Sequence, residues 1–211
     1  MYLKKLWRYP VKSMAGEQLQ EVELTKLGLA GDRQILIQAA TGRILTSRTH
    51  HKLLGLKGTL APDKEPLING LPWHSKEATE LVSETLNQPV KLIRHEGPER
   101  FDILPLLVAT DGAIDYMQID SRRLRPNLII GGVEGLEERT WPQHTLQIGN
   151  TKIAPAQLRG RCVMTTYHPD TLVQDMNVLR NIVKKLEGVM ALDTAVLTTG
   201  HLRINDSVEF F

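Results

Sequence analysis

Short apolar runs separated by turn residues recur along most of the chain, a pattern typical of β-rich proteins. In the first hundred residues these runs lie at 3–9, 18–24, 33–39, 43–46 and 90–94. In the remainder they lie at 106–110, 128–130, 145–148, 152–154, 162–167, 195–199, 202–204 and 207–211. Turn residues separate neighbouring runs, so we predict hairpins at 40–42 and 149–150, and Asn205-Asp206 separates the last two runs.

Three segments have the periodicity or the end signals of helices, namely 75–87, 110–117 and 175–186. Ser75 is suited to cap a helix N-terminus, and Thr110-Asp111 favours a first helical turn. The third segment places apolar residues three and four positions apart, and Gly188 follows where a helix would end. We interpret the proline-rich segment 61–71 as a loop within a domain.

Many antiparallel strands combined with few helices predict a mainly β, α+β fold. We expect a closed or nearly closed antiparallel β-barrel with the helices packed outside it. The segment 95–100 is polar and contains Gly97-Pro98. It is therefore the best candidate for a boundary between two parts of the chain.

Composition places the chain among ordinary globular proteins, with 41% hydrophobic and 24% charged residues out of 211. The single cysteine excludes an internal disulfide framework and an all-cysteine metal or iron–sulfur site made by this chain alone. The N-terminus lacks the apolar segment of a secretory signal, and no apolar run reaches the roughly 18 residues of a membrane span. We therefore expect no membrane association and a cytoplasmic location.

Positive charge is concentrated in two regions, although the net charge is only +2. Residues 1–60 contain ten Lys/Arg against four Asp/Glu, a difference of +6. A second cluster consists of Arg122, Arg123, Arg125, Arg159 and Arg161. Such patches suit a polyanion or a nucleic acid, although isolated lysines more often form a solvated face. Only 5% of residues are aromatic, which argues against recognition of nucleic acid by stacking.

Two N-terminal motifs combine turn residues with basic side chains. Pro10 ends the first run, so that Lys12-Ser13 falls on a turn that offers an ammonium, a hydroxyl and backbone N–H groups. Gly28 to Arg33 (GLAGDR) forms a tight connection from which Arg33 could project into a barrel mouth. The alternatives are a plain β-turn and an Asp32 Asx-turn, respectively.

Two further motifs lie in the C-terminal half. Arg125-Pro126-Asn127 precedes an apolar run, and Asn127 could read the edge of a heterocycle or cap a turn. Cys162 follows Arg161, and neighbouring arginines favour the thiolate, the soft ligand of several transition metals. The alternative for Cys162 is a buried cysteine in a barrel strand. Pairing of Cys162 with His168 as a nucleophile and base would require a sharp bend.

Taken in order, the motifs at 9–13, 28–33, 125–127, 161–162 and 169–171 resemble the MOSC domain family over nearly the whole chain. The similarity is greatest to the branch that includes the mitochondrial amidoxime-reducing component and its bacterial relatives. The resemblance implies an N-terminal MOSC β-barrel region at 1–98 and a MOSC domain carrying the cysteine loop at 99–211.

The resemblance also implies a molybdopterin-type molybdenum cofactor and no iron–sulfur cluster in this chain. By position, Cys162 would be the catalytic residue and the protein ligand to molybdenum. The residues that would contact the pterin or its phosphate are Lys12, Ser13, Arg33, Thr110, Asp111, Arg125, Asn127 and Arg161. Such relatives remove oxygen from small N-hydroxylated compounds with electrons from a separate donor protein.

Three positions depart from the family pattern around the cysteine. Gly160 lies where a partner cysteine is common, His168 where aspartate is common, and Leu172 where glycine is common. Two functions follow from the resemblance: a molybdenum-dependent oxidoreductase, and a non-catalytic carrier of the cofactor or of sulfur as a Cys162 persulfide. An oxidoreductase would retain the metal and reduce substrate, whereas a carrier would release its load.

Overall fold

The computed structural model describes all residues, 1–211. The strands of its first part are β1 (Tyr2–Arg8), β2 (Glu17–Leu19), β3 (Glu21–Thr25), β4 (Gly28–Leu29), β5 (Ile35–Ala39), β6 (Ile44–Leu45), β7 (Gly58–Leu60), β8 (Pro66–Ile68), β9 (Leu71–Pro72) and β10 (Val90–Arg94). Those of its second part are β11 (Leu106–Thr110), β12 (Leu128–Gly131), β13 (Leu146–Ile148), β14 (Thr151–Gly160), β15 (Val189–Thr198), β16 (Gly200–Arg203) and β17 (Val208–Phe210). The α-helices are α1 (Lys76–Leu86), α2 (Asp111–Met117) and α3 (Met176–Leu186).

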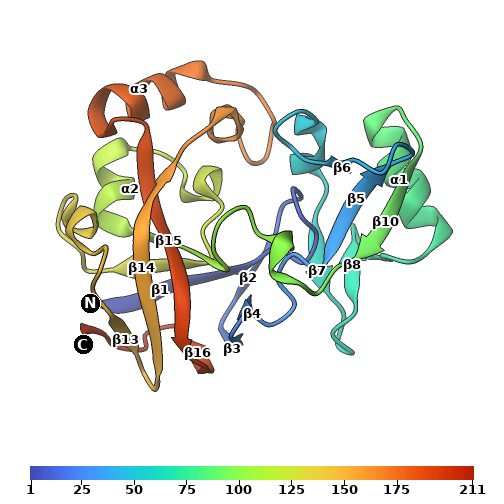
Figure 1. Ribbon diagram of the computed structural model, residues 1–211. Coiled ribbons are helices and arrows are strands. Elements are labelled where there is room, and N and C mark those ends of the chain that lie inside the picture. The colour runs from blue at the N-terminus through green and yellow to red at the C-terminus, as the bar shows by residue number, and fades with distance from the viewer.

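The mainly β, α+β class expected from the sequence is confirmed. The largest sheet has eight strands in the order β17-β13-β14-β15-β11-β12-β1-β2, and only the β11–β12 pair is parallel. Strands β14 and β15 form its longest ribbon, and α2 and α3 lie together on one side of it (Figure 1). No helix has the length and apolarity needed to cross a membrane.

Closure into a barrel is not confirmed by the strand pairing. Strands β17 and β2 are the two edges of the eight-stranded sheet. A single bridge between Tyr2 and Ser207 connects β1 to the segment before β17. Backbone hydrogen bonds from Leu3 to Asp206 (2.9 Å) and from Val208 to Met1 (3.0 Å) surround it. The two termini therefore lie side by side (Figure 1).

A second lobe contains β5, β6, β10 and α1, with β7, β8 and β9 beside them (Figure 1). Its core is formed by ten buried side chains, among them Ile35, Ile37, Leu53, Ile68 and Val82. The larger core is shared between the two parts of the chain. It joins residues of β1, β3 and β4 to those of the C-terminal strands around the fully buried Trp141.

The three predicted helices are confirmed, together with their capping residues. The Ser75 hydroxyl accepts a hydrogen bond from Ala78 N (3.1 Å), and the Thr110 hydroxyl accepts one from Ala113 N (3.2 Å). These contacts satisfy N–H groups that a helix N-terminus leaves unpaired. The helix α3 buries Ile182 and Leu186 in a hydrophobic cluster with side chains of β11, β15 and α2.

Two segments differ from the prediction. Residues 162–167 form a 3-10 helix (Val163–Thr166) rather than a strand, because threonine hydroxyls bond back to the chain. Thr165 Oγ1 donates to Cys162 O (2.8 Å) and Thr166 Oγ1 donates to Val163 O (2.6 Å). The segment 61–71, predicted as a loop, contains β8, whose Leu67 pairs with Thr59 of β7.

Candidate functional site

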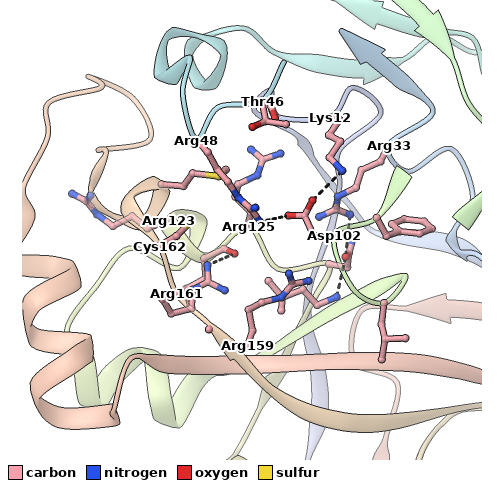
Figure 2. Close-up of a pocket in the computed structure, with 18 residues that line it drawn as sticks. Lys12, Arg33, Thr46, Arg48, Asp102, Arg123, Arg125, Arg159, Arg161 and Cys162 are labelled. Carbon is pink, nitrogen blue, oxygen red and sulfur yellow. Dashed lines mark hydrogen bonds and ion pairs between the residues drawn. The ribbon is translucent and has the colours of Figure 1, made fainter. Parts of the chain in front are cut away.

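A cavity of about 120 Å³ lies where the ends of β1 and β14 meet the start of β12 and the 101–105 connection. Seven of its lining residues are basic and one is acidic. The lining residues are Lys12, Ser13, Arg33, Thr46, Arg48, Phe101, Asp102, Leu104, Leu107, Arg123, Leu124, Arg125, Asn127, Arg159, Gly160, Arg161, Cys162 and Met164 (Figure 2). We call this space the cationic cavity.

Seven of the nine residues predicted from the sequence line this cavity, and two do not. Those that line it are Lys12, Ser13, Arg33, Arg125, Asn127, Arg161 and Cys162. Thr110 caps α2 and donates to buried Glu138 (3.1 Å). Asp111 accepts from Lys4 (3.0 Å) and from the backbone of Gly132 (3.0 Å). Thr110 and Asp111 are therefore engaged elsewhere in the fold.

Lys12 and Ser13 lie on the turn that the sequence predicts. Met14 N donates to Val11 O (3.3 Å), and Ser13 adopts a left-handed backbone with φ 73°. The Lys12 ammonium is largely buried and donates to Arg100 O (2.8 Å). The turn therefore fixes a cation at one wall of the cavity.

Arg33 lies on the turn between β4 and β5, which packs against the residues that follow β1. It too has a left-handed backbone (φ 52°), and its N–H donates to Tyr9 O (2.7 Å). Its guanidinium pairs with the fully buried Asp32 and contacts Asn127 Oδ1 (3.3 Å). Asp32 also accepts from Tyr9 N (2.7 Å), 23 positions earlier in the chain, and this long-range contact is not the local Asx-turn that the sequence offers as the alternative.

The Asn127 amide is occupied by protein partners. Its Oδ1 accepts from Leu107 N (3.1 Å), and its Nδ2 donates to Trp7 O (3.3 Å) and Asp32 Oδ2 (3.2 Å). The residue is fully buried. Its geometry is that of a cross-link between β1, β11 and the Arg33 turn, rather than of an amide free to read a heterocycle edge.

Arg125 contributes a cation that no carboxylate in the structure pairs. Its guanidinium lies 4.4 Å from the centroid of the Tyr9 ring, and that of Arg33 lies 5.2 Å from the same ring. Burial lowers the pKa of Arg125 to about 10 and raises the pKa of Tyr9 to about 12. The Tyr9 hydroxyl donates to Pro126 O (3.2 Å), which fixes the ring beneath the guanidinium.

Cys162 begins the 3-10 helix directly after β14 and is half-buried. Its side chain caps no backbone N–H of that helix. Arg123 supports the loop from outside, because its guanidinium donates to Thr165 O (3.2 Å) and Thr166 O (2.9 Å). The lone thiol is therefore held on a rigid loop at the cavity wall, and not inside a strand.

Arg159 and Arg161 flank the cysteine. Arg159 forms an ion pair with fully buried Asp193 (2.6 Å). Arg161 Nη2 donates to Leu124 O (2.9 Å), and its buried Nε has no partner. Burial lowers the pKa of Arg161 to about 10, and charge on Cys162 opposes that shift.

Four charged residues of the cavity are not among the nine predicted from the sequence, namely Arg48, Asp102, Arg123 and Arg159. Asp102 is the one lining carboxylate, and it pairs with Lys12 (3.0 Å) and with Arg48 (3.0 Å). Burial raises the pKa of Asp102, but the charges of Lys12 and Arg48 outweigh burial and lower it. Arg48 comes from the second lobe and was counted only within the N-terminal basic region.

A second cavity, of about 260 Å³, shares Arg123, Arg125 and Met164 with the cationic cavity. Its other lining residues are Trp7, Tyr9, Ala15, Gly16, Leu54, Lys57, Arg122, Tyr167, Pro169 and Asp170. The buried Nε1 of Trp7 has no hydrogen-bond partner. We call this space the aromatic cavity. Ligand pockets commonly span about 300–1,000 Å³, so the two cavities reach that range only together.

The donor set fits an anionic group next to a planar ring and a soft metal. Guanidinium and ammonium groups bind phosphate, aromatic and arginine faces stack on rings, and a thiolate binds soft metals. The structure contains no group of three or more His, Cys, Asp or Glu arranged to hold a metal ion. A metal at Cys162 would therefore take its other ligands from a bound molecule.

The departures at Gly160, His168 and Leu172 have clear structural positions. A Cβ at Gly160 would meet no atom within 4 Å, so a side chain has room there. His168 Nδ1 accepts from Asp170 N (3.2 Å), and thus orders its own turn instead of pairing with Cys162. Leu172 has a left-handed backbone (φ 57°), a conformation that glycine adopts without steric cost.

Comparison with known families and proteins agrees with this arrangement. A family model described as the MOSC N-terminal beta barrel domain matches residues 1–104, and one described as the MOSC domain matches residues 104–209. The structure of the YuaD protein from Bacillus subtilis superposes with a TM-score of 0.55 at 11% identity, covering 99% of this chain and 94% of that one. That likeness shows the fold alone.

Two human proteins are similar in sequence. Mitochondrial amidoxime reducing component 2 of Homo sapiens is 26% identical over 275 aligned positions, which cover 97% of this chain and 82% of that protein. Mitochondrial amidoxime-reducing component 1 of Homo sapiens is 24% identical over 225 positions, covering 79% of this chain and 66% of that protein.

Proposed function

This chain belongs to the MOSC domain family, and we propose that it is an oxidoreductase that binds a molybdopterin-type molybdenum cofactor and reduces N-hydroxylated compounds. The observation that carries the proposal is the convergence of seven basic side chains and the single thiol on one cavity. A polyanion that also brings a soft metal would satisfy both groups at once.

The cationic cavity would hold the cofactor phosphate. Lys12 approaches from the turn after β1, Arg33 from the turn between β4 and β5, and Arg161 from the end of β14. The unpartnered Nε of Arg161 is a donor without an acceptor inside the protein. A phosphate with several oxygen acceptors would accept hydrogen bonds from the ammonium and guanidinium N–H groups that line the cavity.

The pterin ring would extend from the cationic cavity into the aromatic cavity. Arg125 lines both spaces, and it presents a planar cation stacked on Tyr9. Asn127 would act indirectly, by holding Arg33 and Asp32 in place through its own hydrogen bonds.

Cys162 would be the protein ligand to the metal. The bound cofactor would supply the two-electron chemistry of molybdenum. In the overall reaction the N–O bond breaks, two electrons arrive from a donor protein, two protons are taken up, and the oxygen leaves as water. The role of Arg161 would be to place a positive charge beside the metal-bound sulfur.

The substrate class and the need for a partner rest on the human relatives, whose names describe components that reduce amidoximes. We propose by analogy a small N-hydroxylated substrate and a separate electron donor. The division into regions at 1–98 and 99–211 is retained as a proposal. The cytoplasmic location also remains a prediction, because the names of the relatives refer to mitochondria.

The test is reduction of an amidoxime by protein produced in a host that makes the pterin cofactor. A chemical donor replaces the unknown partner, and amidine formation is measured. We expect turnover from the wild-type protein and none from Cys162→Ser. Absence of turnover together with release of the metal would contradict the oxidoreductase and favour a carrier.

A further inference from the structure

The carboxylate of Asp102 lies inside the cationic cavity, between two basic side chains. It contacts Lys12 Nζ at 3.0 Å and Arg48 Nη2 at 3.0 Å, and its side chain points between them (Figure 2). It is the one acidic side chain among the eighteen lining residues. Asp102 thus offsets part of the positive charge of Lys12 and Arg48 and occupies donors of both while the two ion pairs persist.

Apart from its two ion pairs, Asp102 lies in an irregular connection with few contacts that would fix it in place. Residues 101–105 form bends between the 3-10 helix Pro98–Arg100 and β11. Lys12 anchors the preceding carbonyl of Arg100, and Phe101 is buried. Beyond them Ile103 is 51% exposed, and the Asp102 side chain is 40% exposed. The carboxylate could therefore leave the cavity without disrupting either core.

We propose that Asp102 is a displaceable counter-ion that makes the cationic cavity selective for anions with more than one negative charge. A tethered carboxylate competes as an intramolecular ligand with a high effective concentration. A free monoanion would only exchange one carboxylate-like charge for another, and it would lose translational freedom. A polyanion would in addition reach Arg33 and Arg161, which Asp102 does not contact in the structure.

The inference rests on the proposed anion-binding role of the cavity. It adds that Asp102 makes the cavity bind polyanions in preference to monoanions. The test uses cofactor-free protein, with inorganic pyrophosphate as polyanion and acetate as monoanion, titrated calorimetrically at constant ionic strength. Asp102→Asn keeps the side-chain shape and removes the charge. Glu21→Gln is the matched control, because it removes one carboxylate, paired with Arg203, away from the cavity.

We expect Asp102→Asn to bind pyrophosphate about tenfold more tightly than the wild type, a gain of about 1.4 kcal/mol. We also expect measurable acetate binding in Asp102→Asn and none in the wild type. Glu21→Gln should match the wild type for both anions. Equal affinities in wild type and Asp102→Asn, or weaker binding in the variant, would overturn the proposal; the latter result would mean that Asp102 positions the cations.

Hydrogen exchange gives a readout that separates this inference from the function. Pyrophosphate should speed exchange of the 101–104 amides in the wild type, because Asp102 is released, and should leave exchange in Asp102→Asn unchanged. Slower exchange in the wild type would contradict displacement. Absence of pyrophosphate binding to every variant would contradict the anion cavity itself, and with it both proposals. Asp102→Ala, compared by circular dichroism with the wild type, checks that the fold survives.

Discussion

The amide of Asn127 donates to the buried carboxylate of Asp32 at 3.2 Å, although 95 residues separate them. The same carboxylate pairs with Arg33 and accepts from Tyr9 N. This contact joins a turn of the N-terminal part to the start of β12 in the C-terminal part. It makes the position of Arg33 in the cavity depend on residues from both parts of the chain.

Replacement of Asn127 by alanine should destabilise the protein by about 3 kcal/mol. The variant leaves the Leu107 N–H and part of the Asp32 carboxylate buried without partners, and each such loss costs about 1–3 kcal/mol. Urea unfolding measures the change. Asn177→Ala, exposed on α3, is the control and should change stability little. A loss below about 1 kcal/mol for Asn127→Ala would contradict the cross-link.

Replacement of Arg125 by lysine should weaken pyrophosphate binding roughly fivefold, corresponding to about 1 kcal/mol. Lysine keeps the charge but loses the planar guanidinium that lies over Tyr9. Calorimetric titration measures the affinity. Arg203→Lys, at an exposed ion pair with Glu21, should leave the affinity unchanged. Unchanged binding in Arg125→Lys would show that stacking on Tyr9 does not matter.

Replacement of Asp111 by asparagine should reduce stability at neutral pH by about 1 kcal/mol, with no effect on pyrophosphate affinity. Burial raises the pKa of Asp111, but hydrogen bonds from Lys4, Gly132 and Val133 outweigh burial and lower it below 3.8. A lowered carboxyl pKa gives stability that is complete above the unfolded value and is lost as pH falls through the folded value.

The stability difference between wild type and Asp111→Asn should therefore be constant from pH 7 down to about pH 5 and shrink below pH 3.8. Urea unfolding across this pH range measures it. A weaker affinity for pyrophosphate in Asp111→Asn, with stability unchanged, would contradict the structural role and would support the cofactor-binding role that the sequence resemblance implies for Asp111.

The strand pattern and the helix ends could be predicted because both depend on local sequence. Ser75 and Thr110 cap their helices through contacts three residues away. The 3-10 helix after Cys162 was read as a strand because β-branched residues favour strands, whereas the hydrogen bonds of Thr165 and Thr166 to nearby carbonyls decide otherwise. Local propensity could not reveal that competition.

The candidate site was predicted where residues lie in recognisable motifs and missed where only the fold brings them together. Lys12 and Arg33 lie beside turn residues, and those turn motifs indicated that the two side chains belong to the site. Asp102 and Arg48 lie 54 positions apart, and no local pattern indicates that they meet. Asn127 lines the cavity, but its hydrogen-bond partners, which decide its role, come from β1 and β11.

The central claim is that Cys162 binds molybdenum while the basic residues hold the rest of the cofactor. The most direct test is the molybdenum and pterin content of wild type and Cys162→Ser purified from a host that makes the cofactor. We predict about one molybdenum and one pterin per wild-type chain. For Cys162→Ser we predict loss of most of the molybdenum with much of the pterin retained. Stoichiometric molybdenum in Cys162→Ser, or neither component in the wild type, would contradict the account.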